Sequence, residues 1–313
     1  MNRINFICPK CKRKLIVSPE EYSCSQCKVT YEVVEGILLF TQEDVPYKDE
    51  FTRPNQRVSP LLEFLYRHMH FYHWNERCFF EDNVKKDDVL LDLGCGGGKE
   101  RFLNKGAYCV GLDLSLQALL NAAKIYHQVA RCDIISLPFE DNTFDCVTTS
   151  HVLGHISGEK KDVLLKEIYR VLKKGGKMIN VIETDSHNPF IKDAKRYPAC
   201  YQKYFVESEG HYGLELPSET IKRFEKAGFK LISCKKRDAG RVPLWYFAIY
   251  FDNEFLKEFP ENIQRKVCFA KKMWEIRYLK ILMGFLQGIY QDTWGQWFTE
   301  LDYSMGISTV HCK

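Results

Sequence analysis

Four cysteines near the start of the chain form two Cys-x-x-Cys pairs, which are separated by twelve residues: Cys8 with Cys11, and Cys24 with Cys27. Each pair can present two thiolates to one ion, and a hairpin between the pairs can close all four around it. A redox dithiol or four free thiols are the alternatives. So short a segment, however, has too little apolar content to fold without a metal ion or a cross-link. We therefore predict a structural zinc site, in which four protein ligands leave no open position for catalysis.

A second group of residues could bind a nucleoside. The apolar run VLLDL leads into GCGGGKE, so Asp92 is followed by Gly94, Gly96 and Gly98. Glycines there permit a tight turn between a strand and a helix, and they let a ligand approach the backbone near the start of that helix. Asp113 ends the next apolar run, twenty-one residues after Asp92. A carboxylate at that position can accept hydrogen bonds from both hydroxyls of a ribose.

S-adenosylmethionine (SAM) fits these residues better than a nicotinamide dinucleotide. The dinucleotide pattern Gly-x-Gly-x-x-Gly, counted from either of the first two glycines, would need a third glycine at Lys99 or Arg101. Asp92 precedes the first glycine, where it can face the ammonium group of a methionine moiety. A further acid, Asp133, closes the following apolar run. These features predict a SAM site.

From residue 85 onward, short apolar runs alternate with helical stretches, a pattern typical of a parallel sheet that is covered by helices on both faces. One of these stretches, KDVLLKEIYRVLKK, carries an apolar stripe at helical spacing. We expect the glycine pair Gly175 and Gly176 to end that helix.

These motifs, from about residue 85 to 236, resemble the class I SAM-dependent methyltransferases, specifically the type 11 group. The segment LPFEDNTFDCV is similar to that group's approach to its fourth strand. The resemblance implies a doubly wound α/β fold with a seven-stranded, mostly parallel sheet. It also implies that Asp113 binds the ribose, and that further SAM contacts come from Leu114, Asp133, Ile134, Ser150 and His151. Many relatives read His-x-Leu-Glu-His after that strand, whereas this chain has Gly154 in place of the glutamate. If that acid orients a group in relatives, this chain must do without it.

The chain divides into segments by these changes of pattern. Residues 1–45 are the predicted zinc ribbon, 46–84 a helical linker or cap, and 85–236 the SAM-binding core. The resemblance implies one more strand, antiparallel and inserted between strands five and six, for which residues 305–313 are the candidate. Residues 237–304 are then a helical insertion between the last two strands, which we expect to cap the active site.

The helical insertion could have a different role from that of a cap. Apolar residues recur at helical spacing with basic residues between them, and Val267, Ala270, Trp274 and Ile281 can share one face. Such a face could instead rest on anionic lipid as a peripheral membrane contact.

Methyl transfer from a sulfonium depends mainly on holding the acceptor in line with the methyl group. An oxygen or nitrogen acceptor often needs a base as well. His151 and His211 are the catalytic candidates, because imidazole suits proton transfer near neutral pH. His155, Glu183 and Asp185 are weaker candidates, and a packing role is compatible with each histidine.

Three functions remain open at this point. The first is methyl transfer to a small-molecule, sugar or lipid-linked acceptor, on oxygen. The second is methylation of a base in ribosomal or transfer RNA, with the zinc ribbon recognising the RNA. The third is a SAM-fold scaffold without enzymatic activity. The basic run in the ribbon is short and consists of Lys10, Lys12, Arg13 and Lys14, which is usually a solvated face.

The composition of the chain bears on its class of protein and on its location in the cell. The 313 residues are 45% hydrophobic and 27% charged with a formal net charge of +4, which excludes a disordered chain and does not demand an anionic partner. Thirteen cysteines, mostly scattered singly, indicate reduced thiols rather than a disulfide framework. The start lacks a signal-peptide pattern, and no apolar run is long enough to span a membrane. We expect a cytoplasmic protein; the sequence does not indicate its oligomeric state.

Overall fold

The computed structural model describes most of the chain. The described residues are 4–45, 72–207, 209–237, 257, 260–276, 278–279, 282, 286, 289–290 and 293–313. Most of the predicted linker at 46–84 and the first part of the predicted insertion at 237–304 therefore lie outside them.

Seven strands form the sheet that the resemblance implies. They are β5 (Val89–Leu93), β6 (Tyr108–Asp113), β7 (Gln128–Arg131), β8 (Phe144–Ser150), β9 (Leu172–Glu183), β10 (Lys230–Arg237) and β11 (Gly306–Cys312). Their order is β7-β6-β5-β8-β9-β11-β10. β11 lies between β9 and β10 and runs antiparallel to both, as expected for the last strand. β6 and β7 are buried along their whole length, as strands of a sheet covered on both faces must be.

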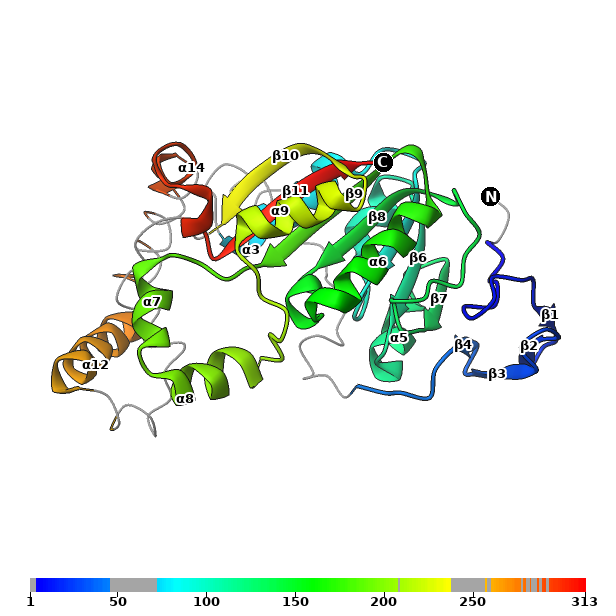
Figure 1. The fold of residues 1–313 in the computed structure, drawn as a ribbon, viewed down its shortest axis with the longest axis horizontal. Helices are drawn as coiled ribbons and strands as arrows, with labels where there is room; N and C mark the ends of the chain where they lie inside the picture. The colour runs from blue at the N-terminus through cyan, green and yellow to red at the C-terminus, as the bar shows by residue number, and fades with distance from the viewer. Residues whose placement is uncertain are drawn as a thin grey trace.

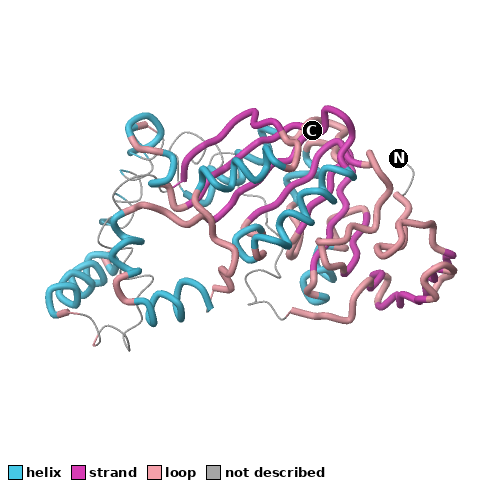
Figure 2. The backbone as a smooth tube through the Cα atoms, in the orientation of Figure 1, coloured by secondary structure: helices cyan, strands magenta, loops and turns pink. Residues whose placement is uncertain are grey.

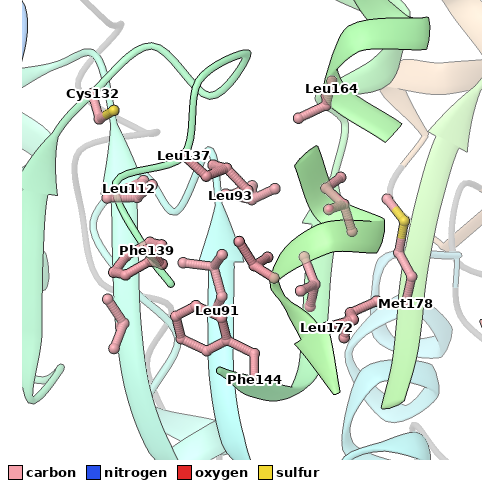
Figure 3. Packing of buried hydrophobic residues seen from close by; sticks show 14 of the residues in the cluster. Leu91, Leu93, Leu112, Cys132, Leu137, Phe139, Phe144, Leu164, Leu172 and Met178 are labelled. Atoms are coloured by element: carbon pink, nitrogen blue, oxygen red, sulfur yellow. The ribbon is translucent and has the colours of Figure 1, made fainter. Parts of the chain in front are cut away.

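Helices lie on both faces of this sheet. α6 (Gly158–Val171) and α9 (Pro217–Lys226) lie in front of it in Figure 1, and α3 (Tyr72–Asn83) lies behind. The short helices α4 (Glu100–Asn104) and α5 (Leu116–Ala122) follow β5 and β6. Leucine and phenylalanine side chains from the strands meet Leu164 of α6 in one layer (Figure 3). The predicted doubly wound α/β fold is thus confirmed.

The expected strand count is wrong, because the N-terminal ribbon extends the sheet. The ribbon contains β1 (Ile16–Val17), β2 (Glu21–Cys24), β3 (Val29–Val34) and β4 (Ile37–Leu39). β4 pairs in parallel with β7, Leu38 opposite Ala130, so eleven strands follow one another in a single order. The ribbon lies beside β7 at the right of Figures 1 and 2. An edge strand has unpaired backbone groups, and β4 satisfies those of β7.

Side chains and backbone also join the ribbon to the rest of the molecule. Phe6 packs on Phe139 with ring centroids 5.4 Å apart, and the residue is only 7% exposed. The Ile7 amide donates to the Pro138 carbonyl at 2.9 Å. The Lys12 ammonium lies 2.6 Å from a carboxylate oxygen of Glu167 in α6. The ribbon therefore shares its hydrophobic core with the sheet.

The predicted end of one helix is also wrong. α6 ends at Val171, and Gly175 and Gly176 lie inside β9 rather than after the helix. Leu172 is fully buried in an extended conformation opposite Phe144. Because burial of Leu172 requires this extended backbone, β9 begins at residue 172, before Gly175 and Gly176. Gly176 then allows a close backbone approach, since a Cβ there would lie 2.8 Å from the Lys173 carbonyl oxygen.

The described part of the insertion is helical. α12 (Glu261–Glu275) and α14 (Trp294–Phe298) belong to it, with the 3₁₀ turn η3 (Leu301–Tyr303) after them. Of the predicted apolar face, Val267 is fully buried, whereas the side chains of Ala270, Trp274 and Ile281 lie outside the described residues. Large side chains are nevertheless exposed on both helices, namely Phe269 on α12 and Trp294, Trp297 and Phe298 on α14. Among the helices that the structure describes, none has the length and apolar character needed to cross a bilayer. Whether the insertion caps the site or rests on lipid stays a prediction.

A buried histidine on β11 should make stability depend on pH. His311 is fully buried and stacks on Phe224, with ring centroids 4.1 Å apart. Burial disfavours the charged ring and lowers the pKa of His311 to about 4, from 6.5 in an exposed residue. Between these values the unfolded chain takes up a proton that the folded chain does not, so stability is complete above pH 6.5 and falls as the pH drops toward 4.

The loss from this one group should reach about 3 kcal/mol, from about 1.4 kcal/mol per pKa unit. We expect urea unfolding of the wild type and of His311→Phe to give free energies whose difference changes by that amount between neutral and acidic pH. The phenylalanine keeps the stacking and removes the titration. Parallel pH profiles for the two proteins would show that His311 contributes no pH dependence.

Candidate active site

The predicted site residues meet at one edge of the sheet. Parallel strands β5 to β9 end at this edge, and the order of the strands reverses between β5 and β8. Ligands of such sheets bind at the carboxyl ends of the strands, beside this reversal. The residues at those ends are Gly94 after β5, Asp113 on β6, Asp133 after β7, Ser150 and His151 at β8, and Glu183 on β9.

The glycine-rich turn after β5 has the backbone that its sequence predicts. Gly94, Gly96 and Gly98 have φ angles of +64°, +54° and +87°. These values are in the left-handed region, which favours glycine. A Cβ on Gly94 would also lie 2.5 Å from a methyl carbon of Val152. Side chains are therefore excluded where the turn passes the end of β8.

Asp113 links this turn to the start of α5. One carboxylate oxygen accepts a hydrogen bond from the Gly96 amide at 2.8 Å, and the other accepts one from the Ser115 amide at 2.9 Å. A carboxylate can accept several hydrogen bonds at once, which suits this side chain to the two hydroxyls of a ribose. Nearby positions on the rim are partly exposed, namely Leu114, Asp133 and Ile134. A fixed carboxylate beside a glycine-rich turn and a partly apolar rim fits the adenosine half of SAM.

Asp92 lies deeper than the sequence indicates. Its side chain is fully buried, and its oxygens accept hydrogen bonds from the Lys99 ammonium at 2.8 Å, the Tyr126 hydroxyl at 2.8 Å and the Thr148 hydroxyl at 2.7 Å. Direct contact with the ammonium group of a ligand would require Lys99 to move. In this structure Asp92 is a buried acceptor at the base of the glycine turn. Its partners Lys99, Tyr126 and Thr148 were not identified from the sequence.

The second half of the site is a cluster centred on Glu183, the last residue of β9. One Glu183 oxygen lies 2.7 Å from Nδ1 of His151, and the other lies 3.3 Å from Nε2 of His211. The ring of His155 lies 5.0 Å from that of His211, centroid to centroid. Asp185 instead forms an ion pair with Lys195 at 2.6 Å. The structure therefore brings together the three candidate histidines and Glu183, and it engages Asp185 elsewhere.

Charge stabilises this cluster. Burial would raise the pKa of Glu183, but the contacts with His151 and His211 outweigh it and hold that pKa well below its usual range. Burial likewise disfavours a charged His211, yet the contact with Glu183 raises the pKa of His211 above its ordinary value. His151 has a φ of +56°, uncommon for a residue other than glycine. Such backbone persists only where surrounding contacts fix it.

Glu183 also bears on the missing acid at Gly154. A Cβ on Gly154 would lie 3.2 Å from a Glu183 carboxylate oxygen. A carboxylate is thus present beside Gly154, supplied by β9 instead of by the segment after β8. The sequence indicated Glu183 only as a weaker catalytic candidate.

Comparison with known proteins agrees with this geometry. Residues 91–180 match the family model described as "Methyltransferase domain". The chain is 36% identical over 169 residues to "Putative methyltransferase ECU09_1500" of Encephalitozoon cuniculi. The matched region spans 51% of this chain and 79% of that protein. The chain belongs to the SAM-dependent methyltransferase family.

Two other relatives of the methyltransferase have names that include a substrate. A demethylmenaquinone methyltransferase of Corynebacterium urealyticum is 36% identical over 107 residues, or 34% of this chain and 46% of the relative. A tRNA (carboxymethyluridine(34)-5-O)-methyltransferase of Arabidopsis thaliana is 30% identical over 107 residues, or 34% of this chain and 26% of the relative. The methyltransferase thus spans less than half the length of either protein.

The four ribbon cysteines of the methyltransferase lie close together. Their sulfur atoms are all within 4.8 Å of one another, with Cys11 and Cys24 3.5 Å apart and Cys8 and Cys27 3.9 Å apart. These separations are far longer than a disulfide bond of about 2.05 Å. Four sulfurs bound tetrahedrally to zinc at about 2.3 Å would lie about 3.8 Å from one another. The cysteine cluster therefore fits a zinc ion.

Proposed function

We propose that the methyltransferase transfers a methyl group from SAM to a hydroxyl oxygen of a small-molecule, sugar or lipid-linked acceptor. The observation that carries this proposal is the His151 and Glu183 pair, which lies beside the glycine turn at the carboxyl ends of β8 and β9. A histidine held by a carboxylate is a suitable base for removing a hydroxyl proton.

The carboxyl ends of β5 to β7 would then bind SAM, and those of β8 and β9 would act on the acceptor. On the β5 to β7 side, the three turn glycines, Asp113, Leu114, Asp133 and Ile134 would hold SAM, with Ser150 toward its methionine end. SAM supplies an electrophilic methyl group on its sulfonium. In the ribbon, Cys8, Cys11, Cys24 and Cys27 would hold one structural zinc ion, which keeps β4 in place on the edge of the sheet.

His151 would act on the acceptor. Glu183 accepts the Nδ1 hydrogen of His151, so Nε2 carries the lone pair of the neutral ring. Nε2 takes the hydroxyl proton as the oxygen bonds to the methyl carbon and the bond from that carbon to sulfur breaks. Glu183 stabilises the imidazolium that results. His211, on the other oxygen of Glu183, helps to fix the orientation of that carboxylate.

The variant His151→Asn tests this role. Asparagine accepts the left-handed backbone that position 151 needs, so the fold should persist. With a phenolic acceptor that is methylated on its hydroxyl oxygen, we expect kcat to fall by about 10² to 10⁴. SAM affinity measured by calorimetry should stay unchanged. The matched control is His187→Asn, an exposed histidine outside the cluster. Full turnover by His151→Asn would contradict the assignment.

RNA remains the second candidate because of the relative named as a tRNA methyltransferase. The ribbon gives it limited support, since Lys12 is occupied by Glu167, Ser136 and the Leu137 carbonyl. Lys10, Arg13 and Lys14 are largely exposed. Methyl incorporation into RNA, weakened when these three residues are replaced by glutamine, would favour this candidate over the first. Absence of any SAM binding would favour the scaffold.

A further inference from the structure

We propose that His155, Glu183 and His211 bind one divalent transition-metal ion at a site separate from the cysteine cluster. Each residue offers one ligand atom, and these atoms all lie within 4.8 Å of one another. Two imidazoles and one carboxylate are a ligand set for zinc, iron(II), manganese(II) or cobalt(II).

The contact between His211 and Glu183 already has the spacing of two ligands on one ion. Their facing atoms, Nε2 and Oε2, are 3.3 Å apart. Ligands bound at about 2.1 Å lie about 3.0 to 3.4 Å apart in octahedral or tetrahedral geometry. His155 completes the set after a small movement of its ring, which is exposed.

Backbone carbonyls orient both imidazoles for metal binding. Nδ1 of His155 lies 3.1 Å from the Gly210 carbonyl oxygen, and Nδ1 of His211 lies 3.2 Å from that of Phe205. A carbonyl oxygen only accepts, so each Nδ1 carries the hydrogen and each Nε2 of a neutral ring carries the lone pair. Metal-binding histidines characteristically donate their second ring nitrogen to a carbonyl or carboxylate in this way.

The carboxylate oxygen that faces His211 needs a positive partner. Within the part of the chain that the structure describes, Oε2 of Glu183 is buried and has no hydrogen-bond partner of acceptable geometry. A lone pair on Nε2 opposite this oxygen would be repulsive at 3.3 Å. A proton on Nε2 of His211 or a metal cation between the two atoms removes the repulsion, and a metal ion would also use the third ligand that His155 offers.

The segment that carries His211 is held against the rest of the site. The Gly213 amide donates to the Gly154 carbonyl at 2.9 Å, and the Lys161 ammonium donates to the Gly213 carbonyl. A Cβ on Gly213 would lie only 1.8 Å from the Ile156 carbonyl oxygen, so glycine is required for this approach. The ligands from η1 (Leu153–His155), β9 and this segment are thus brought together by backbone contacts.

The use of such an ion rests on the proposed function. Three protein ligands leave coordination positions open, and an acceptor hydroxyl that binds there would have a lowered pKa. Its proton would pass to Nε2 of His151, on the other side of Glu183. This predicts acceptors with a coordinating hydroxyl, such as a phenol, quinol or enol.

Cobalt(II) binding to the whole protein tests the site without any acceptor. After removal of metals, we expect two equivalents of cobalt per chain. One gives the near-ultraviolet thiolate charge-transfer band of a cysteine site, and the other gives only weak visible bands. Glu183→Gln and His155→Gln should each weaken the second equivalent by at least about tenfold, since even outer-shell partners of a metal are worth that much. His187→Gln is the control and should bind both equivalents.

Each outcome decides the proposal. A single cobalt per chain in the wild type, or full second-site binding by His155→Gln, would overturn it. His155 is exposed, so its variant keeps the test valid even if Glu183→Gln fails to fold. Two metals without methyl transfer would leave the metal site standing and count against the proposed function. Methyl transfer by a protein that binds only one metal ion per chain would support the proposed function and overturn the second metal site.

Discussion

Replacing Asp113 with alanine should weaken SAM binding at least about hundredfold, which corresponds to about 2.7 kcal/mol. In the structure this carboxylate is fixed by the Gly96 and Ser115 amides and lies beside the partly exposed Leu114. The alanine removes the acceptor of the ribose hydroxyls and also the group that fixes the glycine turn. Calorimetric titration with SAM and with its demethylated product measures the loss.

The matched control for this variant is Asp141→Ala. Asp141 pairs with Arg170 on the surface, with a side chain that is 67% exposed, and such pairs contribute little to stability. It should bind SAM as the wild type does. Circular dichroism of the ligand-free Asp113→Ala protein checks that the fold persists. A folded Asp113→Ala protein with undiminished affinity would remove this residue from the SAM site.

Loss of zinc from the ribbon should destabilise the methyltransferase as a whole, beyond the ribbon itself. The ribbon buries Phe6, Tyr31, Ile37, Leu38 and Leu39, and each such side chain is worth about 1.5 to 3 kcal/mol. Cys24→Ser, or chelation of the wild type, should therefore lower Tm by an amount on the order of 10 °C and expose the edge of β7. Differential scanning calorimetry with metal content measured on the same samples tests this.

An exposed cysteine supplies the control for the zinc experiment. Cys268→Ser in α12 removes a thiol outside the cysteine cluster, and it should leave both Tm and zinc content unchanged. A Cys24→Ser protein that melts with the wild type, or a wild type without zinc, would contradict the structural role of the ion.

The seven-stranded core and the place of its last strand could be predicted from the sequence because local signals agreed with the family pattern. The glycine turn, the acids at strand ends and the apolar C-terminal strand each occupy the place expected of them. By contrast, the junction of β4 with β7 depends on backbone pairing between distant segments, and it leaves no periodic signal. The end of α6 was mispredicted because burial of Leu172 outweighed the nearby glycines.

The site was predicted less completely, for a related reason. Its histidines could be identified from their side-chain chemistry, but the position of Glu183 among them depends on the register between β8 and β9. The His151 amide donates to the Val181 carbonyl at 3.0 Å, which places the end of β9 beside His151. Lys99 and Tyr126, which surround Asp92, were missed because buried partners of a carboxylate have no sequence motif.

The most direct test of the account is titration of the purified wild-type chain with SAM, with NAD as the rival ligand. We expect one SAM site per chain with a Kd in the micromolar range, about −8 kcal/mol, and no heat with NAD. A folded, zinc-loaded protein that binds NAD, or that binds neither ligand, would contradict it.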